Sequence, residues 1–224
     1  MEKIKVLNLY ACLGGNRYKW NEVAKEANVE LEVTAVELDN EAAKLYQERF
    51  PNDKVIVADA HQYLLDHFKE FDFIWSSPPC PSHSRARFAR RNTTTAVYPD
   101  LKLYEEVLFL ENYFEGKYCV ENVIPYYEPL IQAKKRGRHL YWTNFNLPTD
   151  LNERKSSIIE GKDEVNKLCE FHDYDFRKYK GNQRVDKMAR NLVDYEAGRT
   201  IFETFLGITR KQNEKQTSIF DYEK

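Results

Sequence analysis

The chain has 224 residues, of which 42% are hydrophobic and 31% charged, and this composition suits one soluble α/β domain with a sizeable core. The formal net charge of -2 argues against a uniformly basic protein, so any contact with nucleic acid must depend on local clusters. No apolar run approaches the length of a membrane span, and the first residues resemble a strand rather than a signal peptide.

The first predicted strand, Ile4–Leu9, is followed by a turn of small residues over Tyr10–Asn16 and by a helical pattern to about Ala27. A strand, a tight glycine turn and a helix form a general cofactor cradle, because glycine lets the backbone approach a ligand. Paired glycines also occur in many α/β turns for steric reasons alone. The sequence lacks G-x-G-x-x-G, which lowers the expectation of NAD or FAD.

The second predicted strand, Leu31–Val36, runs directly into Glu37. An acid at this place can accept hydrogen bonds from ribose hydroxyls. The alternative is a helix cap, since Asp39 or Asn40 could cap the helix predicted for Glu41–Phe50. We assign Glu37 to a cofactor, and Asp39 or Asn40 to the cap.

A third strand is predicted at Lys54–Val57, followed by a helix to about Lys69, and a fourth strand at Phe71–Trp75. This alternation of strands and helices predicts a mostly parallel sheet with right-handed crossovers. A fifth strand is predicted at Lys117–Val120 after the helix Asp100–Tyr113, so the expected fold is α/β with helices on both faces of the sheet.

Pro78 and Pro79 end the fourth strand, because proline has no N–H to donate to a ladder, and Cys80 follows at the strand's carboxyl end. Residues 84–98 are expected to form a long polar loop. It opens with an acid-free cationic stretch: Arg85, Arg87, Arg90 and Arg91. A cysteine beside such a loop suggests a nucleophile next to a polyanion. A buried cysteine and a solvated charge run are the alternative for this stretch alone.

Glu121 lies at the carboxyl end of the fifth strand, where it is either a functional carboxylate or a solvated acid or cap. A second acid-free basic cluster spans 133–139 and leads into a strand at 140–142. Residues 146–185 lose clear periodicity and are predicted to be a small irregular subdomain. The stretch Lys187–Leu206 is predicted to be helical.

The four cysteines are widely spaced and include no C-x-x-C pair. This pattern argues against structural zinc and favours reduced thiols in the cytoplasm. We therefore expect a cytoplasmic protein without a metal.

Six motifs, one of them made of two strand ends, jointly resemble those of the DNA cytosine-5 methyltransferases, in the family's order, over about residues 4–145 and 183–206. The segments are the first strand and turn Asn8–Gly15, the strand ends Val36–Asp39 and Ala58–Ala60, Pro78-Pro79-Cys80 with Ser84, Glu121-Asn122-Val123, Arg136-Gly137-Arg138, and Arg190–Val193 with Gly198. Four positions depart from the family pattern: Asn8 replaces aspartate, Cys12 and Arg190 replace glycines, and Pro81 replaces glutamine.

The resemblance implies a Rossmann-like S-adenosylmethionine-dependent methyltransferase fold with Cys80, Glu121 and Arg138 as catalytic residues. The implied cofactor-binding residues are Tyr10, Leu13, Gly14, Gly15, Glu37, Leu38, Asp59, Ala60, Pro79, Asn191 and Val193. The implied DNA-binding residues are Ser84, Arg85, Arg87, Arg90, Arg91 and Arg136. The cofactor would be S-adenosylmethionine, and its product S-adenosylhomocysteine.

In this scheme the Cys80 thiolate, with a pKa lowered by a nearby arginine, adds to C6 of cytosine and activates C5. Glu121, held protonated, donates to N3, and Arg138 holds O2. The base must leave the duplex for this chemistry, so base flipping is implied.

The implied organisation is a catalytic domain of residues 1–145 plus 186–208, a reduced target-recognition region of residues 146–185, and a flexible tail of residues 209–224. The expected enzyme methylates double-stranded DNA in a prokaryote or its phage, in the cytoplasm near the bacterial nucleoid. Two alternatives remain: a cytosine-5 methyltransferase acting on RNA (tRNA), and a DNA-binding subunit that needs a partner for specificity.

The segment 216–220 resembles the pentapeptide that binds the bacterial sliding clamp, with Gln216, Ile219 and Phe220 as its contact residues. A polar stretch before it could serve as a tether, so the clamp is an expected partner. The alternative is that Ile219 and Phe220 fold back onto the enzyme's own surface.

Overall fold

The structure, a computed structural model, describes residues 1–154 and 163–208. Its strands are β1 (Glu2–Leu9), β2 (Val29–Glu37), β3 (Lys54–Val57), β4 (Phe73–Ser76), β5 (Lys117–Val123), β6 (Lys134–Arg136) and β7 (His139–Thr143). Its helices are α1 (Trp20–Glu26), α2 (Asn40–Arg49), α3 (Ala60–His67), α4 (Arg85–Ala89), α5 (Lys102–Tyr113), α6 (Glu164–His172), α7 (Val185–Arg190) and α8 (Tyr195–Phe205), with short 3-10 turns η1 (Phe68–Glu70) and η2 (Phe176–Lys178). The residues of the predicted clamp motif, Gln216, Ile219 and Phe220, lie outside the described part.

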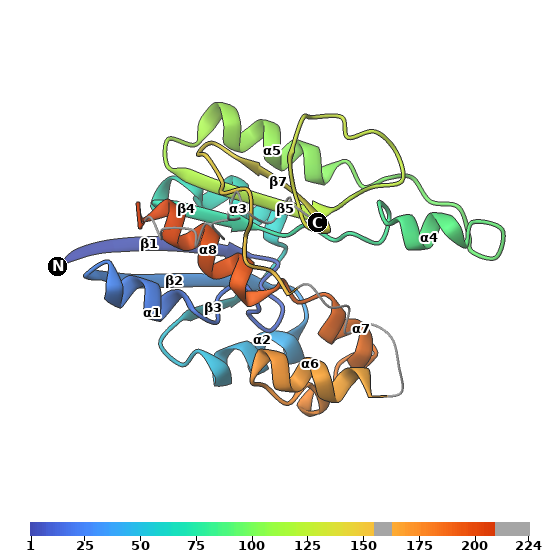
Figure 1. Cartoon of the computed structure of the whole chain (residues 1–224), viewed down its shortest axis with the longest axis horizontal. Helices are drawn as coiled ribbons and strands as arrows, with labels where there is room; N and C mark the ends of the chain where they lie inside the picture. Colours follow the sequence, from blue (N-terminus) through green and yellow to red (C-terminus); the bar gives the residue numbers. More distant parts are fainter. Residues whose placement is uncertain (155–162, 209–224) are drawn as a thin grey trace, which may run out of the picture.

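The seven strands form one sheet in the order β3-β2-β1-β4-β5-β7-β6 (Figure 1). Strands β1 to β5 pair in parallel, whereas β7 is antiparallel to both β5 and β6. The expectation of a mostly parallel α/β sheet is therefore confirmed. The chain leaves β1 toward β2 on one side and later returns to place β4 on the other, so the sheet has its topological switch point between β1 and β4.

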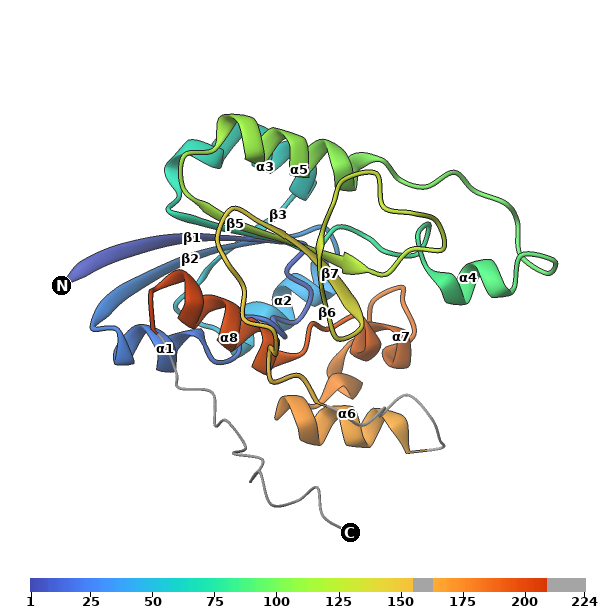
Figure 2. The ribbon, with the colours of Figure 1, turned by 45° about the horizontal axis from the view of Figure 1, so that its top comes forward.

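Helices cover both faces of the sheet, because alternate residues of each strand are apolar on both sides (Figure 2). On one face, α3 and α5 pack against Leu7, Ile74 and Val120. On the other face, α1 and α8 pack against Val6 and Trp75. The helices on the two faces fix the orientation of each strand. They therefore also fix the direction in which the last residues of each strand point.

The backbone of helix α8 packs closely against the segment that follows β1. The Trp20 Nε1–H donates to the Gly198 carbonyl at 3.1 Å, and a Cβ at position 198 would lie 2.3 Å from the Asn16 carbonyl oxygen. Only glycine permits this contact. The segment that follows β1 is therefore held from behind by a helix far along the sequence.

A buried ion pair secures the other side of the same segment. Arg17 donates through Nε and an Nη to the two oxygens of Asp53, both at 2.9 Å, and Tyr46 donates to Asp53 at 2.9 Å. Both charged side chains are 3% exposed. A bidentate pair with a further donor satisfies the charges that burial would otherwise penalise.

Two sequence predictions about local structure were wrong. Residues 84–98 are not a continuous loop, because Ser84 caps a short helix, α4, by accepting a hydrogen bond from the Ala86 N–H at 3.2 Å. The helix predicted for Lys187–Leu206 is broken into α7 and α8, because Asp194 accepts from the Glu196 N–H at 3.0 Å and starts a new helix. Within the described ranges, no helix is long and apolar enough to cross a membrane.

His172 lies at the end of α6 and is fully buried among Phe171, Phe176 and Tyr195. Neither ring nitrogen has a hydrogen-bond partner within the described residues. Burial, and the nearby Arg49, lower the pKa of His172 to about 3. In the folded protein His172 therefore stays neutral, whereas in the unfolded chain it takes up a proton once the pH falls below the ordinary pKa of histidine.

We predict that His172 makes the protein sensitive to acid. As pH falls below about 6.5, only the unfolded chain binds this proton, so the free energy of unfolding should fall by up to about 1.4 kcal/mol per pH unit. His172→Phe should make this acid slope shallower in urea titrations between pH 7 and pH 4. The exposed His67→Phe is the matched control, and equal slopes in the two variants would contradict the assignment.

Candidate active site

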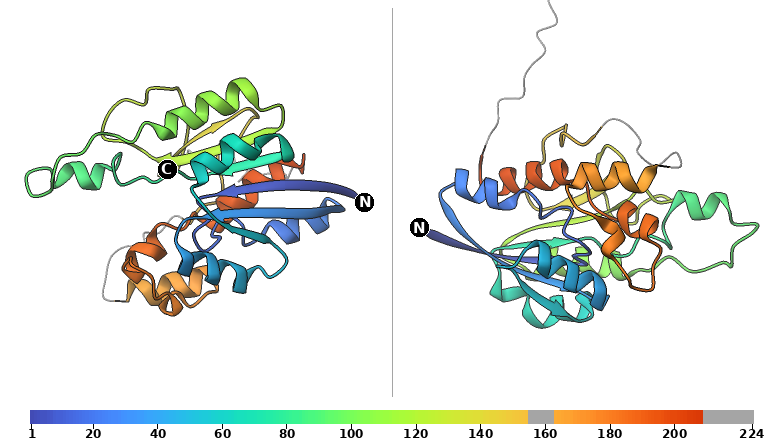
Figure 3. Two further views of the ribbon diagram at one scale, coloured as in Figure 1. Left: turned by 180° about the vertical axis from the view of Figure 1, so that it is seen from behind. Right: turned by 90° about the horizontal axis from the view of Figure 1, so that it is seen from below.

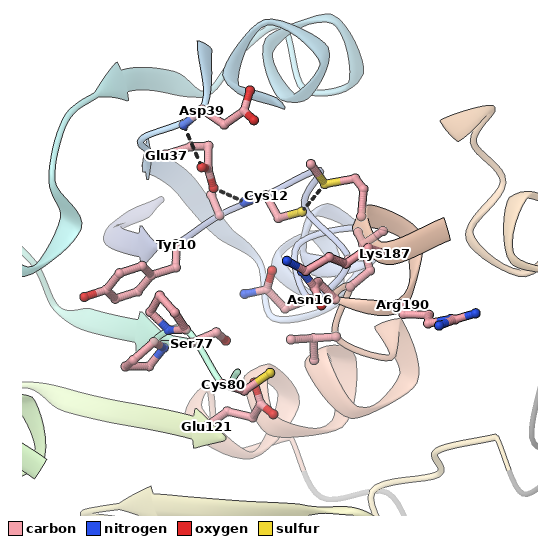
Figure 4. Close-up of a pocket in the computed structure, with 18 of the residues that line it drawn as sticks. Tyr10, Cys12, Asn16, Glu37, Asp39, Ser77, Cys80, Glu121, Lys187 and Arg190 are labelled. Atoms are coloured by element: carbon pink, nitrogen blue, oxygen red, sulfur yellow. Dashed lines mark hydrogen bonds between the residues drawn. The ribbon is translucent and has the colours of Figure 1, made fainter. Parts of the chain in front are cut away.

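The carboxyl ends of β1, β2, β4 and β5 open into a cavity of about 1000 Å³. Its lining comes from many parts of the fold, among them the turn after β1, the ends of β2 and β5, the start of α3, the loop after β4, the turn before β7 and the segment around α7. This is the edge of a parallel sheet, next to its switch point, where α/β proteins bind ligands. Figure 4 shows this cavity with its principal side chains.

The turn after β1 repeatedly enters the left-handed region of backbone conformation. Tyr10 has a φ of 55°, Cys12 of 48° and Gly14 of 69°. A side chain in this conformation is strained, so the turn needs external support. The support comes from Glu37, whose carboxylate accepts from the Cys12 N–H at 2.8 Å and from the Asp39 N–H at 2.9 Å. Cys12, which stands where the family has glycine, is thus held in a glycine-like conformation by the end of β2.

The structure separates the roles of the acids after β2. Asp39 caps α2 by accepting from the N–H groups of Glu41 at 2.9 Å and Ala42 at 3.1 Å, and Asn40 is the first helical residue. Glu37 lies at the cavity wall, and burial raises its pKa above the usual range. The carboxylate that remains for a ligand is therefore Glu37, whereas Asp39 is largely committed to the helix.

Tyr10 is fixed at the cavity wall by a buried carboxylate on α5. Its hydroxyl donates to Glu106 at 2.6 Å, and Ser76 donates to the same carboxyl group at 2.5 Å. His61 Nδ1 lies 3.0 Å from Glu106. Asp59 caps α3 through the His61 N–H at 2.9 Å and lines the cavity with an exposed side chain. The network positions the Tyr10 ring and the first turn of α3 on the same side of the cavity.

Cys80 is positioned by a side chain from the neighbouring strand. Asn122, which is 2% exposed, donates through Nδ2 to the Pro78 carbonyl at 2.9 Å and accepts from the Val123 N–H at 2.9 Å. The Cys80 carbonyl accepts from the N–H groups of His83 and Ser84, which turns the chain immediately after the cysteine. The thiol is half-buried and lines the cavity.

The charge environment of Cys80 differs from the sequence expectation. Burial raises the pKa of the Cys80 thiol, and the carboxyl group of Glu121 raises it further. The opposing cation is Lys187, which reaches into the cavity from α7 (Figure 4). The expectation of a thiol pKa lowered by a nearby arginine was wrong, because the pKa is raised and the cation that acts against this rise is a lysine.

Glu121 and Arg138 line the same cavity as Cys80. Glu121 is buried, and this burial raises the pKa of its carboxyl group, which agrees with the expectation of a protonated side chain. Arg138 is exposed and makes no hydrogen bond or ion pair within residues 1–154 and 163–208. The arrangement combines a thiol, a proton-holding carboxyl group and an available guanidinium.

Most of the predicted cofactor residues also line the cavity. These are Tyr10, Gly15, Glu37, Leu38, Asp59, Ala60, Pro79, Asn191 and Val193. Leu13 and Gly14 do not, which corrects the prediction for these two residues. Leu13 is fully buried in an apolar cluster with α2, and a Cβ on Gly14 would lie 2.3 Å from the Phe50 ring.

The predicted DNA-binding arginines lie apart from the cavity. Helix α4 extends away from the sheet in both views of Figure 3, with Arg85, Arg90 and Arg91 exposed. Arg85 donates to the Pro125 carbonyl at 3.0 Å, which ties the base of this arm to the segment after β5. Arg136 differs from the prediction, because its guanidinium is occupied by the carbonyl groups of residues 135, 147 and 148.

The region of residues 146–185 is more regular than predicted, since it contains α6 and η2. Leu168 and Phe176 pack against Leu45 of α2, and Arg49 of α2 donates to the His172 carbonyl at 2.5 Å. Residues 180–183 line the cavity. The predicted recognition region is therefore anchored on the helix that follows Glu37.

Several residues at the site were not predicted from the sequence. Asn8 is buried and lines the cavity. His139 lies between Glu121 and Glu153, and Lys187 faces Cys80. His139 could have been found from strand periodicity, because it shares a face of β7 with Tyr141. Glu153 and Lys187 follow no motif, so only the fold shows them.

Comparisons with known proteins agree with this geometry. A family model described as C-5 cytosine-specific DNA methylase matches residues 4–112. The chain is similar to a tRNA (cytosine(38)-C(5))-methyltransferase of Rattus norvegicus, with 28% identity over 123 residues, or 50% of this chain and 31% of that protein. It is also similar to the Homo sapiens protein of the same name, with 31% identity over 87 residues, or 38% and 22% of the two chains.

These matches span about a third or less of the curated relatives' length. Among solved structures, a mutant of Spodoptera frugiperda DNMT2 aligns over 92% of this chain and 99% of that chain, with 14% identity and a TM-score of 0.47. Glu121 and Arg138 lie beyond residues 4–112, so their assignment depends on their position in the cavity.

We predict that Asn122 keeps the loop before Cys80 in place. Asn122→Ala leaves the buried Pro78 carbonyl without a donor, which should lower the free energy of unfolding by about 1–3 kcal/mol. It should also speed the reaction of Cys80 with a thiol reagent, measured by mass spectrometry of the peptide. Asn112→Ala, on the exposed face of α5, is the control. Unchanged Cys80 reactivity would contradict a positioning role for Asn122.

Proposed function

This chain belongs to the C-5 cytosine methyltransferase family, and we propose that it transfers a methyl group from S-adenosylmethionine to C5 of a cytosine in double-stranded DNA. One observation supports the proposal most strongly: Cys80, Glu121 and Arg138 line a single cavity together with Glu37 and the glycine turn. A nucleophile, an acid and a cation at one end, and a ligand cradle at the other, suit transfer between two bound molecules.

The cradle end of the cavity fits S-adenosylmethionine. Glu37 retains lone pairs beyond its two backbone bonds and can accept from ribose hydroxyls. Tyr10 offers an aromatic face, and the buried Asn8 amide lines the cavity, where it can donate to a carboxylate. The bound cofactor would supply an electrophilic methyl group on its sulfonium.

Cys80 would act as the nucleophile. Its thiolate adds to C6 of the cytosine ring, which makes C5 electron-rich, and the thiolate leaves again after C5 has lost its proton. The raised pKa of Cys80 means that little thiolate exists before substrate binds. Lys187 favours the charged form from across the cavity, so it supplies the role that the sequence assigned to an arginine.

Glu121 and Arg138 would stabilise the base during this addition. Because burial favours its protonated form, Glu121 can donate a hydrogen bond to N3 as negative charge develops on the ring. Arg138, which makes no protein ion pair within the described ranges, can donate to O2. Each group acts on an atom where charge builds up in the reaction.

The exposed cations of α4 support a nucleic-acid substrate. Arg90 and Arg91 are exposed and directly follow α4, on the arm that extends away from the sheet, where they can hold phosphates without reading sequence. A cytosine within a duplex must flip out to reach Cys80, and an arm of this kind can hold the opened strand. The names of the two similar mammalian proteins make tRNA the second candidate substrate.

We predict that Cys80→Ser abolishes methyl transfer and leaves cofactor binding largely intact, because the hydroxyl is a far weaker nucleophile. Transfer of labelled methyl from S-adenosylmethionine should be measured with duplex DNA and with tRNA in parallel, which also decides the substrate. Wild-type protein should form a covalent adduct with the 5-fluorocytosine form of the substrate. Cys169→Ser, away from the cavity, is the control. Near wild-type transfer by Cys80→Ser would refute the mechanism.

We predict that Glu37→Ala weakens cofactor binding by about 1–3 kcal/mol, because it removes a ribose acceptor and leaves the Cys12 N–H unpaired. Calorimetric titration with S-adenosylhomocysteine checks this value. Glu48→Ala, an exposed change on α2, should bind as wild type does. An unchanged dissociation constant for Glu37→Ala would exclude Glu37 from the cofactor site.

A further inference from the structure

A histidine lies between two carboxyl groups behind the proposed catalytic glutamate. His139 Nε2 is 3.6 Å from an oxygen of Glu121, and His139 Nδ1 is 3.9 Å from an oxygen of Glu153. The three side chains come from β7, from β5 and from the segment after β7. The His139 side chain is 22% exposed and that of Glu121 is 9% exposed, so solvent screens the contact only weakly.

Glu153 is held in place by two further contacts. Tyr141 donates its hydroxyl to Glu153 Oε1 at 2.9 Å. The other oxygen lies against Gly137, whose φ is 49°, and a Cβ at that position would be 2.2 Å from Glu153 Oε2. Glycine is needed there both for the left-handed turn and for the carboxylate's approach. Glu153 therefore contacts both the turn that carries Arg138 and the histidine that lies beside Glu121.

The charges around Glu121, His139 and Glu153 favour the protonated form of His139. Burial alone would lower the pKa of His139, but Glu121 and Glu153 raise it above the ordinary range. Burial would raise the pKa of Glu153, but His139, the hydrogen bond from Tyr141 and the positive charge of Arg138 lower it. The titratable and charged groups that act on these three side chains are Arg138, Tyr141, Arg154, Asp194, Cys80 and Cys119.

We propose that His139 and Glu153 are positioning residues for Glu121, with Glu153 holding the imidazolium of His139 against the catalytic carboxyl group. The proposal rests on the proposed function and deepens it. When Glu121 gives its proton to N3, it becomes a carboxylate beside the imidazolium, which stabilises that charge. When Cys80 leaves C6, N3 returns the proton to Glu121, so no proton is gained or lost by the pair.

This arrangement stabilises the deprotonated form of Glu121, which burial alone does not do. A buried carboxyl group is easily kept protonated but is a poor donor, because its conjugate base is unstable without solvent. A cation held 3.6 Å away stabilises that base without occupying the cavity itself. Glu153 itself belongs to the predicted recognition region of residues 146–185, so this region contacts the histidine that lies beside the catalytic acid.

The first test measures the histidine in the protein without substrate. Nitrogen-15 and carbon-13 NMR titration should resolve the five histidines, with His139 assigned from the signal missing in His139→Gln. We expect a pKa of His139 above its ordinary value in the wild type, and a fall of about one pH unit in Glu153→Gln. The exposed Glu128→Gln should leave it unchanged. An unchanged His139 titration in Glu153→Gln would overturn the proposal.

The second test measures single-turnover methyl transfer against pH on the substrate that the wild type accepts. Glu153→Gln removes a negative charge beside His139 and Glu121, so both should lose their protons at lower pH. The pH–rate profile should shift toward acid, with a rate loss of about tenfold or more. His139→Gln should lose rate at least as strongly, while Glu128→Gln and His67→Gln follow the wild type.

If Glu153 only stabilises the fold, the pH dependence of the rate is different. In that case Glu153→Gln slows transfer equally at every pH or lowers only the melting temperature, and either outcome would overturn the proposal. Circular dichroism and melting temperature establish that each variant is folded before its rate is compared. Wild-type protein that is folded but inactive on DNA and on tRNA would refute the proposed function instead, and the NMR titration would still report on the His139–Glu153 pair.

Discussion

The hydrogen bond from Asn122 to the Pro78 carbonyl is the constraint on which the site depends. It joins the ends of two neighbouring parallel strands, β5 and β4, at the edge where both Glu121 and Cys80 emerge. The pairing between β4 and β5 extends only as far as Ser76 and Val120, so the loop that follows β4 needs another tether beyond that point. Two prolines supply no N–H of their own, and one buried amide therefore determines where the thiol stands relative to the carboxyl group.

The cofactor end depends on a comparable constraint of a different kind. A turn with left-handed residues at 10, 12 and 14 is unfavourable unless its N–H groups find acceptors. Glu37 supplies one acceptor, while the Arg17–Asp53 pair and the Gly198 contact hold the chain that follows. This explains why cysteine is tolerated at position 12. Arg190 is tolerated for another reason: its guanidinium pairs with Glu164 at 2.5 Å and points away from Cys80 (Figure 4).

The sequence predicted the parts of the fold that depend on short-range pattern. Strands such as Lys54–Val57 were placed correctly, and Cys80 and Glu121 share one cavity because the parallel strands β4 and β5 share a carboxyl edge. Arg138 reaches the same cavity from the turn between the antiparallel strands β6 and β7, which strand order alone did not predict. The short helix α4 was missed because its five residues show no periodicity, and its cap is a single serine. Lys187 and Glu153 were missed because long-range packing alone brings them to the site, and no local spacing reports it.

The contact between Gly198 and Asn16 has a consequence for the order of folding. These residues are far apart in sequence, yet Trp20 is fully buried only when α8 covers it. During synthesis the ribosome releases the glycine turn, the cysteine loop and Glu121 long before this helix. The aromatic surface around Trp20 must therefore stay uncovered in the nascent chain until α8 has been made. Contacts between residues so far apart in sequence form slowly. Catalytic competence should consequently appear late, in one step with the docking of α8.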